Sequence, residues 1–195
     1  MKTRIITGVL LAAGFLAVLW SGGIWFAGLI TLMAVLGYYE YIRLNRLKWS
    51  DPVSLAGFLG VICIVFPWES FFHSPPLNFE SVVWSVMLLL LAATVASKNR
   101  VNLQHAAIHI LGVIYIGTGF HYMIVTRMMD DHGLFWAVFI FGCIWLTDIG
   151  AYFSGRAAGK RPLWPEISPN KTVEGAVGGL VFSVITAAAL SLFAA

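Results

Sequence analysis

The stretch that decides the fold of this chain is LFWAVFIFGCIWLTDIGAYFSGR, residues 134–156. A helix needs about 20 mostly apolar residues to cross roughly 30 Å of hydrocarbon, and this stretch has that length and character. It also carries Asp148 near its end and Arg156 at its last position. An ionisable residue at membrane depth costs about 2.5 to 3.5 kcal/mol on insertion scales, so these polar positions are candidates for function.

The composition of the whole chain agrees with a membrane protein. The 195 residues are 59% hydrophobic and only 11% charged, with a mean hydropathy of +0.86. These values exclude an ordinary soluble domain. The apolar runs are long and continuous, without the strict alternation of an outer-membrane strand, so helices are the expected spanning form. The sequence therefore predicts an all-α, polytopic bundle in a single integral membrane domain over residues 1–195.

Seven apolar runs approach the length of a span. The third run is closed early by Pro67, so a re-entrant or tilted segment would fit it equally well. The predicted spans are residues 4–20, 23–42, 53–68, 81–97, 104–126, 134–156 and 172–194.

The positions of lysine and arginine predict the orientation. Cytoplasmic segments of membrane proteins carry an excess of these residues. With the N-terminus in the cytoplasm, eleven of the twelve basic residues fall on that side, and only Arg127 falls outside. The segment 156–172 is then a cytoplasmic basic loop, and the expected location is the cell inner membrane. The eleven are Lys2, Arg4, Arg43, Arg46, Lys48, Lys98, Arg100, Arg156, Lys160, Arg161 and Lys171.

Polar side chains share one face of the sixth predicted helix. Tyr152 follows Asp148 by four residues and Arg156 follows it by eight, which is one-turn spacing. At about 1.5 Å per residue, Asp148 lies roughly 9 Å below the cytoplasmic edge of the hydrocarbon. It is placed for a metal ion, a cation or a polar partner, and Arg156 for an anion. In the alternative interpretation, Asp148 pairs with an arginine of a neighbouring helix, and the basic residues anchor lipid headgroups.

The loop after this helix contains the second group of candidates. Ser168-Pro169 is a good pair for an N-cap and first turn, so the seventh helix is predicted to start there, with its N–H groups available to an anion. Lys171, Thr172 and Glu174 would lie in its first turn and add a charge, a hydroxyl and a carboxylate. Gly155 and Gly159 form a small-xxx-small pair that permits close helix contact or close approach of a phosphate; the spacing does not choose between them.

These residues carry a family resemblance. The pattern Asp148-x-x-Ala-Tyr-x-x-Gly-Arg-x-x-Gly-Lys160, followed by Ser168-Pro-x-Lys-Thr-x-Glu-Gly175, resembles phosphatidate cytidylyltransferase, also called CDP-diacylglycerol synthase. A second predicted helix ending in Tyr39-Glu40-Tyr41, with Arg43 close behind, is similar more loosely. The resemblance implies transfer of a cytidylyl group from CTP to phosphatidic acid, with Mg²⁺, in a homodimeric enzyme within the lipid bilayer.

The chain departs from the family pattern after its seventh span. Family members continue into a Lys-Asp segment and an element with His-Gly-Gly and Asp-Arg-x-Asp, whose acidic residues are implied to hold the catalytic metals. The sequence stops at Ala195, so it resembles the front portion of the enzyme. The expectation is that this chain alone folds partly and catalyses little.

The resemblance and the residue types together give each candidate a role. Asp148, Lys171 and Glu174 are expected in catalysis, with Asp148 as a metal ligand. Substrate contacts are expected from Tyr152, Arg156, Lys160, Ser168 and Thr172.

Other interpretations are open at this point. A CTP-dependent lipid kinase would transfer the γ-phosphoryl group instead. A non-catalytic membrane protein or transporter would use Asp148 and Arg156 as a coupling pair, although no internal repeat is found. His105 and His109 have a spacing that can hold a metal, but no third ligand is apparent, and surface or packing roles are the expected ones.

Overall fold

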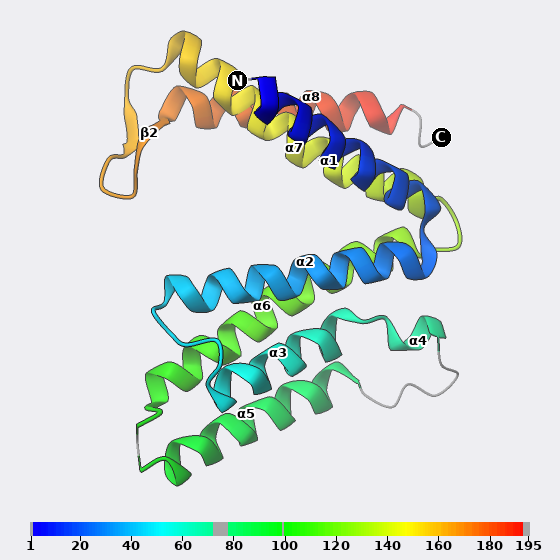
Figure 1. Cartoon of the computed structure of the whole chain (residues 1–195). Helices are drawn as coiled ribbons and strands as arrows, with labels where there is room; N and C mark the ends of the chain where they lie inside the picture. The colour runs from blue at the N-terminus through cyan, green and yellow to red at the C-terminus, as the bar shows by residue number, and fades with distance from the viewer. Residues whose placement is uncertain (1, 72–77, 99, 193–195) are drawn as a thin grey trace. The chain divides into compact units, whose positions relative to one another are not determined.

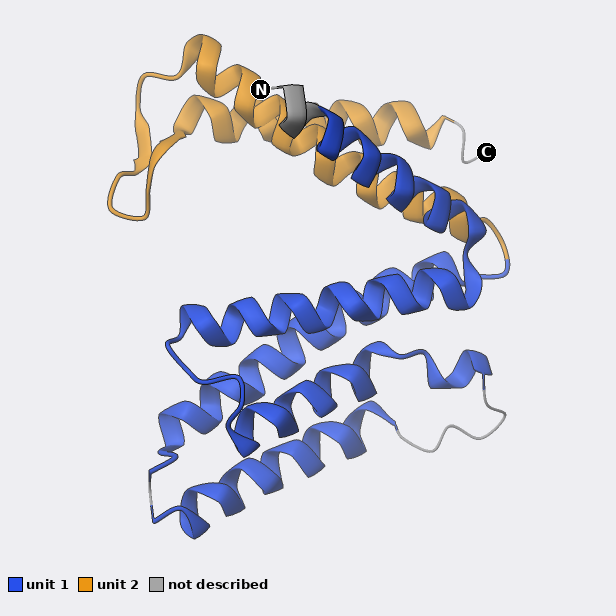
Figure 2. Ribbon diagram, viewed as in Figure 1, with its two compact units in different colours: residues 1–130 blue, residues 131–195 orange. Residues whose placement is uncertain are grey.

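The computed structural model describes residues 2–71, 78–98 and 100–192. The chain divides into two compact units, Met1–Asp130 and Asp131–Ala195 (Figure 2). That residues 1–195 form a single membrane domain stays a prediction, because it depends on how the two units join.

The first unit is a helical bundle in which α2 and α5 run opposite to α3 and α6 (Figure 1). Helices α3 and α6 pack against each other, and α2 and α5 lie against this pair, while α1 contacts α2. The helices of this unit are α1 Lys2–Ser21, α2 Gly23–Leu44, α3 Pro52–Val65, the short α4 Trp68–Phe71, α5 Phe79–Ala96 and α6 Leu103–Arg127.

A stripe of side chains on α2 forms much of the core of this unit. Phe26, Ile30, Ala34, Tyr38 and Ile42 recur every four residues, and each is 0% exposed. This is the spacing at which side chains of one helix lie on one face. The first unit is thus organised around one apolar helix face.

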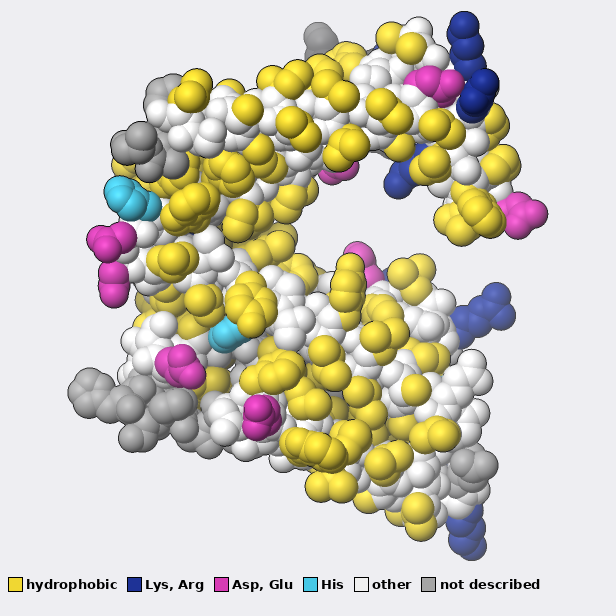
Figure 3. Space-filling view, turned by 180° about the vertical axis from the view of Figure 1, so that it is seen from behind, with side chains coloured by type: hydrophobic (Ala, Val, Ile, Leu, Met, Phe, Trp, Pro, Cys, Tyr) yellow, Lys and Arg dark blue, Asp and Glu magenta, His cyan; other side chains and the backbone are white. Residues whose placement is uncertain are grey.

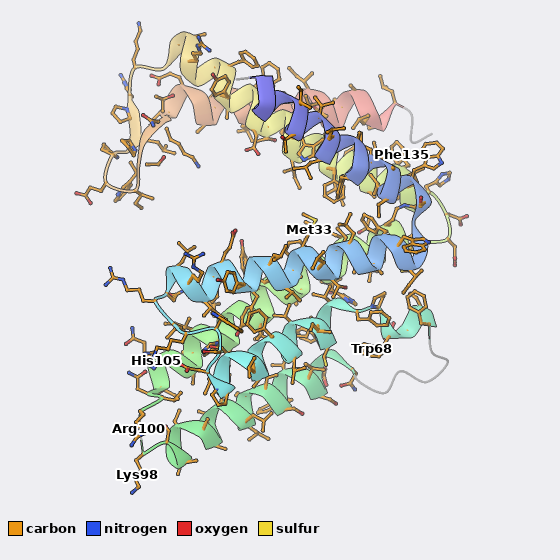
Figure 4. All side chains as sticks on the ribbon, viewed as in Figure 1. Met33, Trp68, Lys98, Arg100, His105 and Phe135 are labelled. Atoms are coloured by element: carbon orange, nitrogen blue, oxygen red, sulfur yellow. The ribbon has the colours of Figure 1, made fainter. Side chains whose placement is uncertain are left out.

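Basic residues gather at one end of the first unit. Lys98, Arg100 and His105 lie around the connection between α5 and α6 (Figure 4). The C-terminal end of α2, which carries Arg43 in its last turn, lies at the same end of the unit (Figure 1). Arg127 is at the opposite end of α6. Within this unit, the helices therefore alternate as the charge pattern predicted.

The second unit contains two long antiparallel helices joined by a β-hairpin (Figure 1). Its elements are α7 Gly133–Ala158, β1 Pro162–Trp164, β2 Ser168–Thr172 and α8 Val173–Ser191. In the hairpin, Pro162 pairs with Thr172 and Trp164 pairs with Ser168. The hairpin lies at the end of α7 that carries Arg156.

The helices agree with an integral membrane protein. Within the described residues, five helices are long and apolar enough to cross a membrane, namely α2, α5, α6, α7 and α8. Two shorter apolar helices, Ile6–Ser21 and Pro52–Val65, lie where the first and third spans were predicted. Hydrophobic side chains cover much of the helix surfaces, and the basic side chains in view gather near helix ends (Figure 3). The all-α membrane class is confirmed, and seven as the number of spans stays a prediction.

The predicted spans differ from the helices by a few residues at most ends, and the third span shows the clearest cause. The third helix stops at Val65 rather than residue 68, because Phe66 has an extended backbone, as expected for the residue before Pro67. The seventh predicted span includes residues 193 and 194, which lie outside the described part of the chain.

Candidate functional site

Small residues let α7 and α8 pack closely beneath the hairpin. A methyl group added at Gly175 would lie 2.9 Å from the Ala151 carbonyl oxygen, and one at Gly179 would lie 3.0 Å from the Thr147 carbonyl oxygen. Both glycines are buried. Close backbone approach through small residues is a common way for membrane helices to associate.

Thr172 joins the hairpin to both helices. Its Oγ1 accepts a hydrogen bond of 3.1 Å from the backbone N–H of Gly175, which makes Thr172 the N-cap of α8. A methyl group at Gly155 would lie 3.1 Å from this Oγ1 and 3.5 Å from the Gly175 Cα. One at Gly159 would lie 2.9 Å from the threonine Cγ2. The sequence left two functions open for Gly155 and Gly159, close helix contact and close approach of a phosphate. The structure shows that both glycines pack closely against the start of α8.

The predicted start of the seventh helix was wrong. Ser168 and Pro169 lie in strand β2, and the helix begins five residues later, at Val173. Ser168 lies opposite Trp164 in the hairpin register, so this segment pairs with β1 instead of turning into a helix. Thr172 takes the cap position, because its hydroxyl can accept from Gly175. Lys171 is consequently a strand residue rather than a first-turn residue.

A pocket of about 520 Å³ opens between α7, α8 and the hairpin. All of its lining belongs to the second unit. Helix α7 supplies one wall, the two strands supply another, and the first turn of α8 closes the base. The lining residues are Asp148, Ala151, Tyr152, Gly155, Arg156, Leu163, Asn170, Lys171, Thr172, Gly175 and Ala176.

The polar stripe predicted on the sixth span lines this pocket. Asp148, Tyr152 and Arg156 all contribute to α7's wall. Arg156 donates a hydrogen bond of 3.2 Å from Nη1 to the hydroxyl of Tyr152. Within the described residues of the second unit, no arginine pairs with Asp148. The alternative of an arginine partner on a helix of the first unit stays open.

The predicted residues of the loop divide into two groups. Lys171 and Thr172 line the pocket, opposite the α7 stripe. Lys160, Ser168 and Glu174 do not line it. The structure thus brings five of the eight candidates to one pocket, and the other three do not line it.

Glu174 has a different environment from the one expected. Its Oε2 accepts backbone hydrogen bonds from Lys160, at 3.1 Å, and from Arg161, at 3.2 Å. The carboxylate therefore binds the chain segment that leads from α7 into β1.

The donor set can be tested against a magnesium ion. Mg²⁺ prefers oxygen ligands, and it is usually bound through one or two carboxylates together with substrate phosphates and water. Asp148 supplies one exposed carboxylate in the pocket, and Glu174 is engaged by backbone N–H groups. No group of three or more acidic, histidine or cysteine side chains able to hold a metal occurs among the described residues. One carboxylate next to bound phosphates fits magnesium, whereas an all-protein metal cage does not fit.

Asn170 and Leu163 line the pocket but were not among the predicted site residues. Asn170 brings a side-chain amide to the pocket beside Lys171, and Leu163 brings an apolar side chain from β1. Asn170 stands inside the same Ser-Pro-x-Lys-Thr run, so its neighbours gave a signal for it. Leu163 reaches the pocket only through strand pairing, which the sequence did not reveal.

His109 packs in the core of the first unit. His109 is only 2% exposed, and its Nδ1 lies 2.9 Å from the hydroxyl of Tyr38, to which it is hydrogen-bonded. The expected packing role is therefore confirmed for His109.

Near the end of α2, Arg43 lies over the ring of Tyr39, with its Cζ 5.7 Å from the ring centroid.

Comparison with known proteins identifies the family. The sequence profile of the Cytidylyltransferase family matches residues 2–195. A phosphatidate cytidylyltransferase of Bacillus subtilis (strain 168) is 41% identical over 195 residues, which is 100% of this chain and 72% of that protein. Proteins of the same name from Staphylococcus saprophyticus and Staphylococcus aureus (strain COL) are 37% and 34% identical over 193 residues, covering 99% of this chain and 73% of each relative. This chain belongs to the cytidylyltransferase family.

Proposed function

We propose that this protein transfers a cytidylyl group from CTP to phosphatidic acid, which gives CDP-diacylglycerol and pyrophosphate. This proposal rests on the pocket of the second unit, which Lys171, Arg156 and Asp148 all line. The pocket lies between α7 and α8, two helices long and apolar enough to cross a membrane. The names of the relatives agree with this activity. Such a pocket offers cations for phosphates where a lipid headgroup can reach them.

In the proposed reaction, an oxygen of the lipid phosphate attacks the α-phosphorus of CTP. A new P–O bond forms, the bond between the α-phosphorus and the bridging oxygen breaks, and pyrophosphate leaves with the electron pair. Reactions of this kind need little covalent help from a protein, so positioning and charge neutralisation dominate the catalysis.

We assign the phosphate contacts to Lys171 and Arg156. Lysine offers a mobile point charge, and the arginine guanidinium offers a planar fork that matches two phosphate oxygens. The hydroxyl of Tyr152 accepts a hydrogen bond from Arg156 and orients its guanidinium in the pocket. Thr172 holds the start of α8 at the pocket base, and Lys160 and Ser168 would meet substrate only at the margin.

A magnesium ion would be held by Asp148 together with substrate oxygens. When bound, it would neutralise charge on the nucleotide phosphates and help to orient them. The remaining positive charge of the site would come from this chain's own Lys171 and Arg156.

The proposed pocket faces the cytoplasm, in the inner membrane of a bacterial cell. The support is the excess of lysine and arginine at the hairpin end of α7 and at the α5–α6 connection. CTP is a cytosolic nucleotide, so this orientation gives it access. A homodimer is proposed from the family resemblance alone.

The test is CTP-dependent release of pyrophosphate in lipid vesicles that contain phosphatidic acid. It is measured with this chain and with a full-length relative carrying the same change, because the chain spans 72% to 73% of these relatives and is expected to catalyse little alone. Lys171→Ala is expected to lower turnover about 100-fold, as does removal of a single charge-stabilising donor in other enzymes. Lys98→Ala is the matched control, because Lys98 lies at the α5–α6 connection of the other unit. Unchanged turnover in Lys171→Ala would remove this lysine from the site.

A further inference from the structure

We infer that Glu174 is a positioning residue, which acts by holding the hairpin wall of the pocket against the start of α8. This inference rests on the proposed function for its catalytic consequence, but its structural part stands on contacts within the second unit. It replaces a direct role for Glu174 at a metal ion or a substrate.

The carboxylate of Glu174 does not line the pocket. Thr172 and Gly175, on either side of Glu174 in the chain, line the pocket, whereas Glu174 does not. Its Oε2 receives the backbone N–H groups of Lys160 and Arg161. A carboxylate that accepts two N–H groups forms charge-assisted hydrogen bonds, which are stronger than neutral ones.

The hydrogen bonds of Glu174 hold the chain segment just before strand β1. Both backbone polar groups of Arg161 are hydrogen-bonded. Its N–H donates to Glu174, and its carbonyl oxygen accepts from the N–H of Val173 at 2.9 Å. Arg161 immediately precedes strand β1. Three hydrogen bonds therefore tie the start of this strand to the first turn of α8: two from backbone N–H groups to the Glu174 carboxylate, and one between the backbones of Val173 and Arg161. The chain cannot shift here without breaking them.

The strands held by these hydrogen bonds form one wall of the pocket. Strand β1 brings Leu163 to the pocket, and its partner β2 brings Asn170 and Lys171. A two-stranded hairpin alone is only marginally stable in water, so its direction depends on what holds its base. Glu174 therefore determines where the ammonium group of Lys171 stands relative to Arg156.

A bland alternative is that Glu174 only stabilises its helix. Acidic residues in a first turn interact favourably with the helix dipole. That role would depend on the charge of the side chain, and it would not involve Lys171. A metal-binding role would depend on the charge as well. Hydrogen-bond acceptance depends instead on an oxygen at the same position, which glutamine also supplies.

The first experiment measures amide hydrogen exchange at Lys160 and Arg161 in the whole chain without substrate. Glu174→Ala is expected to speed exchange at both amides. Glu174→Gln should bring the exchange back toward that of the unmodified protein, because its neutral oxygen still accepts both N–H groups, although more weakly than a carboxylate. Glu166→Ala, which removes an exposed acid from the turn of the same hairpin, is the matched control. Equal exchange in Glu174→Ala and the unmodified protein would overturn the inference, whatever the reaction proves to be.

The second experiment measures turnover of CTP and phosphatidic acid. Glu174→Ala is expected to lower kcat about tenfold or more, since a small misplacement of a catalytic group is costly, and Glu174→Gln should restore most of the loss. In a Lys171→Ala background, Glu174→Ala should cost clearly less, because both changes act through one lysine. A glutamine variant as inactive as alanine, or fully additive effects, would contradict a positioning role. Absence of turnover in the unmodified chain would count against the proposed function instead.

Discussion

Arg156 donates a hydrogen bond from Nη1 to the hydroxyl of Tyr152, one helical turn before it on α7, and both side chains line the same pocket. The bond is 3.2 Å long and lies at an exposed position. It directs a guanidinium, which would otherwise be free to rotate, toward the space between α7 and the hairpin. A substrate phosphate would then meet a cation that is already oriented.

Tyr152→Phe tests this orientation. The ring is retained and only the hydroxyl is lost, so we expect KM for CTP to rise about three- to tenfold, within the range for loss of one hydrogen bond. Arg156→Ala removes the charge as well and is expected to have the larger effect on kcat/KM. Steady-state kinetics in vesicles measures both variants. A tyrosine variant more damaged than the arginine variant would show that Tyr152 has a role of its own.

Thr172 is expected to stabilise the start of α8. Replacing an N-cap threonine by alanine typically costs about 1 kcal/mol, because the N–H that it accepts loses its partner. Thr172→Ala should therefore lower the free energy of unfolding by about that amount. Thr172→Ser keeps the hydroxyl and is the control. Denaturation in detergent followed by circular dichroism measures the difference, and equal stability of the two variants would argue against the cap.

The bond between Tyr38 and His109 is expected to stabilise the first unit. Tyr38 is 0% exposed and His109 is 2% exposed, so neither can turn to water when the other is changed. Tyr38→Phe should destabilise the unit by about 1 to 3 kcal/mol, since it leaves a buried imidazole nitrogen without its partner. Tyr115→Phe is the matched control, because Tyr115 is 74% exposed. Thermal unfolding compares them, and a variant as stable as its control would contradict this account.

Arg127 is expected to hold α1 in the first unit. Its Nε donates to the carbonyl oxygen of Leu19 at 2.7 Å, and its Nη2 donates to that of Trp20 at 2.9 Å. These carbonyls lie in the last turn of α1, where no intrahelical partner is available. Arg127→Ala should therefore increase proteolysis near residue 20, whereas Arg100→Ala should not. Unchanged cleavage would show that α1 is held in another way.

The features of this chain that were predicted correctly depend on local periodicity. The shared face of Asp148, Tyr152 and Arg156 followed from one-turn spacing in a long apolar run, and all three residues line one pocket. Hydropathy located the helices to within a few residues, because a span of hydrocarbon thickness leaves a long signal in the sequence.

The features that were missed depend on contacts between distant residues. Ser168 and Thr172 both have side chains suited to an N-cap, and only the pairing of β1 with β2 decides between them. Glu174 binds N–H groups 13 and 14 residues away, so its neighbours gave no sign of this contact. Arg127 was recognised as the exception to the charge pattern, but its partners are 107 and 108 residues away.

The central claim is that this protein moves a cytidylyl group to phosphatidic acid. The most direct measurement supplies the purified chain in vesicles with phosphatidic acid and with CTP labelled at either the α- or the γ-phosphorus. The account predicts that the α-label enters the lipid fraction and that the γ-label is released as pyrophosphate. Transfer of the γ-label to lipid would identify a lipid kinase instead, and retention of both labels in CTP would contradict the proposed activity of this chain.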